Sequence, residues 1–219
     1  AKVGTRPEKS GGAGEAAIKT SFFFRGTYGC PSKSSRYSMA TSRPRTMQVR
    51  SGECEFMSVM NDRMIEDWVK RGGITPFDPA TVNPASIDLR YSGRWRWATN
   101  TAERWTAVND SDELIIEQGQ LFLLDTIEYV TMPLEYGGML MLKSSMGRLG
   151  LEHLHAGWFD PAFQGTATLE VTNLHPYPVT LKRGQPIVQL VLMKMAQRPS
   201  RGYDVTGRYN GQNSPQVAR

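Results

Sequence analysis

The chain has 219 residues, of which 39% are hydrophobic and 10% aromatic, and this is enough for one domain with a real core. Because no stretch approaches the roughly 20 apolar residues that span a bilayer, we expect a soluble, cytoplasmic protein with no membrane partner. The net charge of +5 is concentrated in residues 1–56, which carry +6, whereas the remainder carries −1. The basic character therefore does not indicate a nucleic-acid partner for the folded part.

Residues 1–56 are rich in Gly, Ser, Lys and Arg without a sustained period, which is typical of a disordered basic extension. We favour a vector-derived or upstream-translated segment, because Met57 and Met60 lie just before the first periodic element; a transit peptide is the alternative. Both cysteines, Cys30 and Cys54, precede that element. Two free thiols in a reducing compartment are expected rather than a disulfide.

A helix is predicted to start at Asn61 or Asp62, which can cap it, and to end at Gly72 and Gly73. Its apolar residues fall at helical spacing: Met64, Ile65, Trp68 and Val69. The next segment contains three prolines that exclude helix, Pro76, Pro79 and Pro84. A strand is expected to begin at residues 86–89. Trp95, Trp97 and Trp105 then bracket a polar hairpin or insertion, and they favour a hydrophobic lid or core over a base-stacking platform.

Short apolar runs alternate with turn signals from Glu113 onward: LIIE, QLFLLDTIEYV, GGMLMLKSS, TATLEVTN, VTLKRGQ and PIVQLVLMKM. This spacing predicts an all-β fold, a distorted barrel or jelly roll, over residues 57–196. Residues 197–219 return to Gly, Arg, Tyr and Asn without a strand pattern, and we expect them to form a lid over a charged ligand.

The stretch from 143 to 170 concentrates the reactive side chains. In TATLEV, Ala167, Leu169 and Val171 share one face of a strand, so Glu170 lies on the other. A carboxylate within an internal strand is partly desolvated, which raises its pKa toward that of a useful general base. Upstream, the strand LMLKSS ends in a Ser-Ser turn near Lys143 and Arg148, a combination that suits phosphate.

Several catalytic classes lack their residues. The three histidines, with no cysteine after residue 56, exclude a cytidine-deaminase type of zinc site, so no catalytic metal is predicted. No GxSxG elbow, Walker A loop or GxGxxG motif is present. His153 and His155 alternate on a strand-like run, where a supporting role in the site and a purely structural role are both open.

Six blocks in order resemble the motifs of the dCTP deaminase family, part of the trimeric dUTPase-like superfamily. They are NPASIDLR (83–90), KSSMGRLGL (143–151), HAGWFDPAFQG (155–165), TLEVTN (168–173), RGQPIVQL (183–190) and GRYNGQ (207–212). The resemblance implies a distorted β-barrel subunit in a homotrimer with active sites at subunit interfaces. It implies no catalytic metal, with Mg²⁺ entering bound to the nucleotide triphosphate.

The resemblance also implies roles for individual residues. Glu170 would activate the water that attacks C4 of cytosine, supported by Arg148 and Ser144. Asp160 would bind the 3′-hydroxyl of the deoxyribose. The other residues implied to bind substrate are Lys143, Ser145, Ala156, Phe163, Gln189, Tyr203, Arg208, Tyr209 and Gln212.

The expected function is hydrolytic deamination of dCTP to dUTP and ammonia, which supplies dUMP for thymidylate synthesis. The first alternative is a bifunctional enzyme that carries dCTP to dUMP and pyrophosphate, which the run AGW after His155 leaves open. In a plain dUTPase, Asp160 would activate the water, but Glu170 argues against that reading. The third is a nucleotide-binding regulator without catalysis, which would not need Glu170.

Overall fold

The computed structural model describes residues 58–154 and 156–218. The expected basic extension at 1–56, with its two cysteines, and His155 lie outside the described residues. None of the helices within the described ranges combines the length and the apolar character needed to cross a membrane.

Helix α1 (Asp62–Lys70) forms as predicted because the side chain of Asn61 accepts a hydrogen bond from the backbone N–H of Met64 at 3.0 Å. Ile65, Trp68 and Val69 are buried by this helix, whereas Met64 is 39% exposed. The indole Nε1 of Trp68 donates to a backbone carbonyl oxygen of the sheet at 3.1 Å. The helix therefore packs on the sheet through one face, as its apolar spacing indicates.

The proline-rich segment after α1 is extended except at one turn. Strands β1 (Ile74–Thr75) and β2 (Val82–Asn83) flank a short 3-10 helix, η1 (Pro79–Thr81). The prediction that prolines exclude helix here is wrong at η1, because Pro79 occupies the first helical turn, where its missing N–H costs nothing. The carboxylate of Asp78 caps η1 by accepting from the N–H of Ala80 at 3.0 Å.

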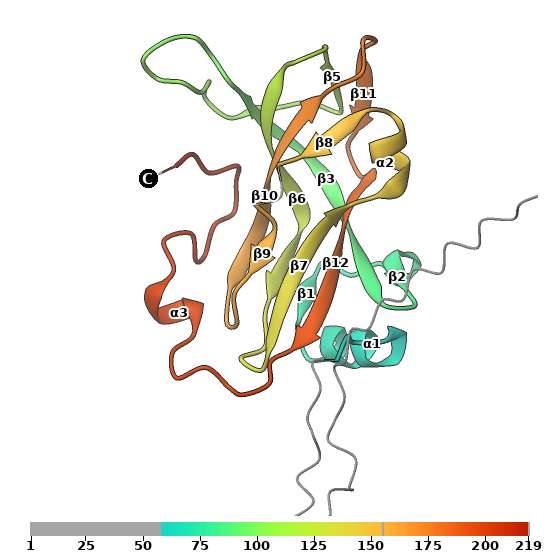
Figure 1. The fold of residues 1–219 in the computed structure, drawn as a ribbon, viewed down its shortest axis with the longest axis vertical. Helices are drawn as coiled ribbons and strands as arrows, with labels where there is room; N and C mark the ends of the chain where they lie inside the picture. Colours follow the sequence, from blue (N-terminus) through green and yellow to red (C-terminus); the bar gives the residue numbers. More distant parts are fainter. Residues whose placement is uncertain (1–57, 155, 219) are drawn as a thin grey trace, which may run out of the picture. The chain divides into compact units, whose positions relative to one another are not determined.

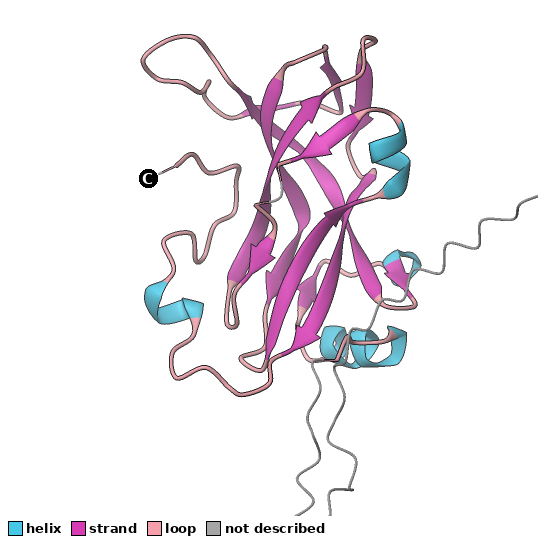
Figure 2. Ribbon diagram, viewed as in Figure 1, coloured by secondary structure: helices cyan, strands magenta, loops and turns pink. Residues whose placement is uncertain are grey.

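Most of the predicted strands form one curled antiparallel sheet in the order β8-β10-β6-β3-β12-β7-β9, with β1 beside β6 and β2 and β4 beside β3 (Figures 1 and 2). A second sheet pairs β11 with β5. The longer strands are β3 (Ser86–Trp97), β6 (Leu121–Thr131), β7 (Tyr136–Leu142), β10 (Gln164–Asn173) and β12 (Pro186–Lys194). The shorter strands are β4 (Asn109–Asp110), β5 (Glu113–Ile116), β8 (Leu151–His153), β9 (Trp158–Phe159) and β11 (Val179–Lys182). Two further helices are short, α2 (Ser144–Arg148) and α3 (Tyr203–Thr206).

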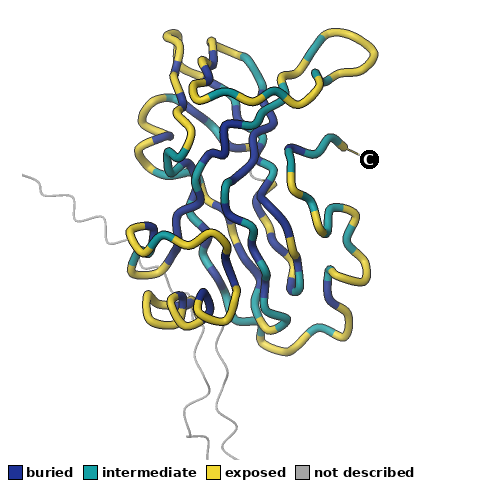
Figure 3. The backbone as a smooth tube through the Cα atoms, turned by 180° about the vertical axis from the view of Figure 1, so that it is seen from behind, coloured by how far each residue is buried: buried dark blue, intermediate teal, exposed yellow. Residues whose placement is uncertain are grey.

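Strand β3 connects the two halves of the curled sheet. Its residues 87–90 pair with β12, and its residues 91–97 pair with β6. A register shift lies between Tyr91 and Trp95, and such a bulge bends a strand and increases its twist. The core fills the inside of the curl, and Figure 3 shows buried backbone concentrated along the central strands.

The alternation predicted for β10 is confirmed. Ala167, Leu169 and Val171 are 0% exposed and belong to the core. Glu170 is half-buried on the opposite face. This face points away from the core and also carries Thr168.

A buried polar cluster joins β3, β6 and β10 around Asp125, which is 0% exposed. Its carboxylate accepts from Ser92 Oγ, from Arg94 Nη2 at 2.5 Å and from Thr166 Oγ1 at 3.5 Å. Burial raises the pKa of Asp125 to about 6, against the lowering effects of Ser92 and Arg94. The cluster therefore stabilises the fold only as long as the Asp125 carboxylate accepts the hydrogen bonds of Ser92, Arg94 and Thr166.

Asp125→Ala should lower the free energy of unfolding by about 3 kcal/mol, because removing one partner leaves Arg94 and Ser92 without an acceptor. Urea denaturation measures this loss. The matched control is Asp67→Ala, which breaks an exposed ion pair with Lys70 at 3.3 Å and should cost less than about 1 kcal/mol. Equal losses in the two variants would contradict the structural role of the cluster.

Candidate active site

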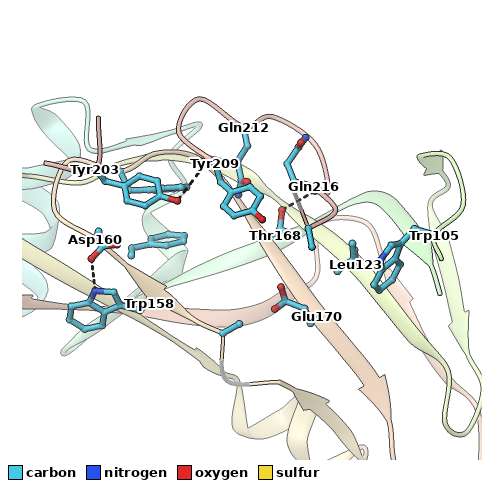
Figure 4. A pocket seen from close by; sticks show the side chains of 14 residues that line it. Trp105, Leu123, Trp158, Asp160, Thr168, Glu170, Tyr203, Tyr209, Gln212 and Gln216 are labelled. Carbon is cyan, nitrogen blue, oxygen red and sulfur yellow. Dashed lines mark hydrogen bonds between the residues drawn. The ribbon is translucent and has the colours of Figure 1, made fainter. Parts of the chain in front are cut away.

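A cavity of about 380 Å³ lies over the outer face of β10, and we call it the β10 cavity (Figure 4). Its walls come from β10, β6, the segment 156–163, one loop residue after β3 and the C-terminal segment, residues 197–218. The lining residues are Trp105, Leu123, Ala156, Trp158, Phe159, Asp160, Phe163, Thr168, Glu170, Tyr203, Tyr209, Gln212, Gln216 and Ala218.

Glu170 is the acid in the middle of this cavity. It pairs in register with Leu123 of β6, and Thr168 precedes it on the same face of β10. Its Oε2 atom is buried and has no hydrogen-bond partner among the described residues. Burial raises the pKa of the Glu170 carboxyl, because desolvation disfavours its charged form. A carboxyl group in this condition is suited to exchange protons with a bound molecule.

Asp160 and a group of aromatic rings form another part of the cavity. The indole Nε1 of Trp158 donates to Asp160 Oδ1 at 3.0 Å, which fixes the carboxylate. The rings of Phe159 and Phe163 stack with centroids 4.4 Å apart, and Tyr203 lies 5.7 Å from Phe163. This part combines one oriented acceptor with apolar surface, the usual composition of a small-molecule site.

The C-terminal segment covers the cavity by bonding along β10. The backbone N–H of Thr166 donates to the carbonyl oxygen of Gln212 at 3.0 Å. The side-chain Nε2 of Gln212 donates to the carbonyl oxygen of Thr166 at 2.6 Å. Gly165 (φ +150°) permits this approach, because a Cβ there would stand 2.9 Å from Gln212 O. Further along, Gln216 N–H donates to Thr168 Oγ1 at 3.2 Å. The segment is thus held in place as a cover.

The charged side chains that line the cavity among the described residues are all acidic. Two carboxylic acids, Glu170 and Asp160, line it, while no lysine or arginine does so within the described part of the chain. No group of three or more His, Cys, Asp or Glu side chains among residues 58–154 and 156–218 could hold a metal ion. A polyanionic ligand in this cavity would therefore need cations from outside these lining residues.

Comparison with known proteins identifies the family. The model of the family "DCD: dCTP deaminase-like" matches residues 59–195. The chain belongs to the dCTP deaminase family. The prediction made from the six blocks, that this chain is an enzyme of that family, is confirmed.

Individual relatives agree with this assignment. A "dCTP deaminase, dUMP-forming" of Mycobacterium avium (strain 104) is 35% identical over 182 residues, which covers 74% of this chain and 95% of the relative. One of the same description from Rhodococcus erythropolis is 37% identical over 178 residues, covering 72% and 93%. The crystal structure of 2′-deoxycytidine 5′-triphosphate deaminase from Agrobacterium tumefaciens aligns with TM-score 0.55 and 20% identity, covering 64% of this chain and 49% of that one. The predicted β fold of the dCTP deaminase family is confirmed.

The structure brings most of the residues implied by the dCTP deaminase resemblance together in the β10 cavity. They are Glu170, Ala156, Asp160, Phe163, Tyr203, Tyr209 and Gln212. They come from β10, from the segment before it and from the C-terminal segment, which are separated by up to 56 residues in the sequence. Arg208 precedes Tyr209 but is exposed and does not line the cavity.

The remaining residues that the family resemblance implied lie elsewhere in the chain. Ser144, Ser145 and Arg148 belong to α2, which contributes nothing to the β10 cavity. Arg148 instead lines a separate hollow of about 320 Å³ with His175, Tyr177 and neighbouring residues.

Two further residues contact the β3 strand instead of the cavity. Lys143 Nζ forms a close ion pair with Asp88 of β3, which also accepts from Asn83 Nδ2 at 2.9 Å. Gln189 of β12 pairs in register with Asp88 and Met141. Lys143 therefore holds the start of α2 against β3.

Some residues of the cavity were not identified from the sequence. Thr168 shares the outer face with Glu170, so the alternation of β10 could have found it. Trp158 stands two residues before Asp160, within the block HAGWFDPAFQG, so its place beside Asp160 in the sequence could have identified it. Trp105 was interpreted from the sequence as part of a hydrophobic lid or core, and it lines the cavity. Leu123 and Gln216 gave no signal, because distant segments bring them to the site only when the chain folds.

Proposed function

We propose that this protein hydrolyses dCTP to deoxyuridine nucleotide and ammonia in the β10 cavity, and carries the product on to dUMP and pyrophosphate. The observation that carries the first step is the buried, unpartnered Oε2 of Glu170 in a covered cavity. Such a carboxyl group is a proton acceptor and donor held away from bulk water, as addition of water to C4 requires.

In the deamination step, water attacks C4 while Glu170 accepts one of its protons and passes it to N3 as the C4–N3 double bond opens. Glu170 then takes the proton of the new C4 hydroxyl and delivers it to the amino group. The C4–N bond breaks, ammonia leaves and the carbonyl of uracil forms. One carboxylate acting as base and then acid contributes about 10²–10⁴ to the rate, and rigid positioning by β10 supplies part of the remainder.

The onward step distinguishes this proposal from simple release of dUTP. The sequence alone favoured dUTP as the product, but the relatives at 35% and 37% identity are described as dUMP-forming. Asp160, oriented by the Trp158 indole at 3.0 Å, is our candidate for activating the water that cleaves the α–β phosphoanhydride. The products are then dUMP and pyrophosphate.

We also propose a homotrimer in which a neighbouring subunit completes each site. The β10 cavity contains two acids without a lining lysine or arginine in the described chain, so the triphosphate needs cations from elsewhere. Arg148 and the hydroxyls of Ser144 and Ser145 are outside the cavity of their own subunit. In a neighbouring cavity Arg148 would supply a cation, and the two hydroxyls would donate hydrogen bonds to phosphate.

An exposed apolar hollow beside the cavity fits a second copy of the chain. Met139, Met141 and Trp158 are 41–46% exposed there, and Trp158 lines both the hollow and the β10 cavity. Contiguous exposed apolar surface of this kind marks interaction sites. A subunit docked on it would reach the edge of the cavity.

Mg²⁺ would enter with the triphosphate and offset its charge. Because Mg²⁺ keeps several waters and takes only one or two carboxylates in addition to substrate phosphates, a cavity with Asp160 as an oriented carboxylate fits this mode. The residues of the chain would then bind and orient the nucleotide.

Incubation of the purified protein with dCTP and Mg²⁺ tests the proposed products. We expect ammonia, dUMP and pyrophosphate to appear in equal amounts on chromatography, with no accumulation of dUTP. Accumulating dUTP would reject the onward step and retain the deaminase. Hydrolysis of added dUTP with dCTP untouched would reject the deaminase itself in favour of a plain dUTPase, and binding without turnover would favour a regulator.

A further inference from the structure

Trp105 occupies one end of the β10 cavity although it comes from a distant loop. This loop, residues 98–108 between β3 and β4, is closed at its base by the Ala98–Trp105 bridge and by Thr106 N–H donating to Trp97 O at 3.1 Å. Trp105 is half-buried and is not among the side chains that pack on the core, unlike Trp95, whose ring lies 5.5 Å from that of Phe122. Its apolar surface is therefore turned to the cavity.

The order of residues along the cavity indicates what Trp105 faces. Figure 4 shows Asp160 and Tyr203 toward one end, Glu170 between, and Leu123 with Trp105 toward the other end. Under the proposed function, Glu170 acts at C4 of the base and Asp160 lies on the sugar and phosphate side. The pyrimidine ring then extends from Glu170 toward Leu123 and Trp105.

Arg96 connects the loop to the C-terminal segment. Its Nη1 donates to the carbonyl oxygen of Thr106 at 2.8 Å, next to Trp105. Its Nε donates to the carbonyl oxygen of Pro215 at 3.0 Å, next to Gln216. Trp105 and Gln216 both line the cavity. The guanidinium group of Arg96 therefore joins the 98–108 loop to the C-terminal segment at the edge of the cavity.

We propose that Trp105 contacts the pyrimidine base of the nucleotide and closes the cavity beside Glu170, and that Arg96 is a positioning residue that holds the loop and the C-terminal segment together. This inference rests on the proposed function and adds a specificity-determining residue to it. An indole wall offers a broad apolar face to a planar base. It also excludes water from the carboxyl group that exchanges protons.

Replacing Trp105 tests the contact. We expect Trp105→Ala to lower kcat/KM for dCTP by about 10- to 100-fold, the range expected for loss of one base–aromatic contact. Binding of dCTP to the same variant in a Glu170→Gln background, measured by calorimetry, should weaken by a similar factor. Trp105→Phe should recover most of the loss, and it keeps the test available if the alanine variant does not fold.

Trp97→Ala is the matched control, because Trp97 stands at the base of the same loop, is 42% exposed and does not line the cavity. Its kcat/KM should stay within about 2-fold of the parent. If the parent protein does not deaminate dCTP, the proposed function fails. If the parent does so and Trp105→Ala matches Trp97→Ala, the proposed function stands and this inference is overturned.

A double-mutant cycle tests the positioning role of Arg96. Arg96→Met should raise KM for dCTP several-fold with a smaller effect on kcat. The substitution releases the 98–108 loop and the C-terminal segment from each other but leaves Glu170 in place. In the Trp105→Ala background, the same substitution should change KM by less than half as much, since residues that act through one element are not additive. Fully additive effects would overturn the proposed link.

Discussion

Glu170→Gln should lower the rate of dCTP deamination by at least about 10³-fold while dCTP binding changes only a few-fold. The amide fills the same space on the outer face of β10 but cannot accept a proton from water. Single-turnover measurements give the rate of the chemical step, and calorimetry gives the affinity. Thr172→Val is the control, because Thr172 lies two residues further on the same face of β10 and does not line the cavity. Turnover retained in the glutamine variant would refute the role of Glu170.

The raised pKa of Glu170 also predicts how the stability of the Glu170→Gln variant differs from that of the wild type as the pH changes. Because burial holds the folded-state pKa above the usual value, the folded protein binds this proton more tightly than the unfolded chain does. The stability of the wild type should therefore fall as the pH rises from the usual pKa of a glutamate through the raised one. Glutamine lacks this proton, so Glu170→Gln should be more stable than the wild type at neutral pH and should lose that advantage in acid.

The same shift sets the pH dependence of catalysis. Glu170 must be ionised to accept a proton from water, so the rate should fall as the pH drops through its raised pKa. The acidic limb of the kcat/KM profile should lie above the usual pKa of a glutamate. A limb at or below that usual value would show that another group limits the reaction.

Mixing two inactive variants should restore activity if neighbouring subunits share each site. Arg148→Ala retains Glu170, and Glu170→Gln retains Arg148, so a site between two different subunits can contain both native residues. With random assembly from equal amounts, roughly one quarter of the sites are complete, and about that fraction of the wild-type rate should return. The measurement is deamination after the two variants are unfolded and refolded together.

Two comparisons make the mixing experiment decisive. Each variant refolded alone should stay inactive, which excludes recovery by refolding itself. Ser144→Ala mixed with Glu170→Gln should also recover activity, because Ser144 lies on the same helix as Arg148 and outside the β10 cavity. Absence of recovery in assembled mixtures would show that Arg148 and Glu170 do not meet across an interface, and the shared-site proposal would be wrong.

Local patterns in the sequence predicted helix α1, the longer strands and the face on which Glu170 lies, but the Ser-Ser turn expected at residues 144–145 is the start of helix α2. The period-two alternation of β10 fixed which face Glu170 takes, because successive side chains on a strand point to opposite sides. The capping side chain of Asn61 and the apolar spacing after it defined α1. The 3-10 turn at Pro79 was missed, because proline is compatible with the first turn of a helix and incompatible only with later turns.

The contents of the cavity depended on contacts between segments far apart in the chain. Trp105, Leu123 and Gln216 reach Glu170 only because β6 pairs with β10 and because Arg96 joins the 98–108 loop to the C-terminal segment. The family resemblance also grouped Arg148 with Glu170, whereas in this chain Arg148 lines a separate hollow and not the β10 cavity. Periodicity reports the face of a residue within its own element. Which elements meet depends on strand pairing and packing over the whole chain, and this information is absent from any single stretch of residues.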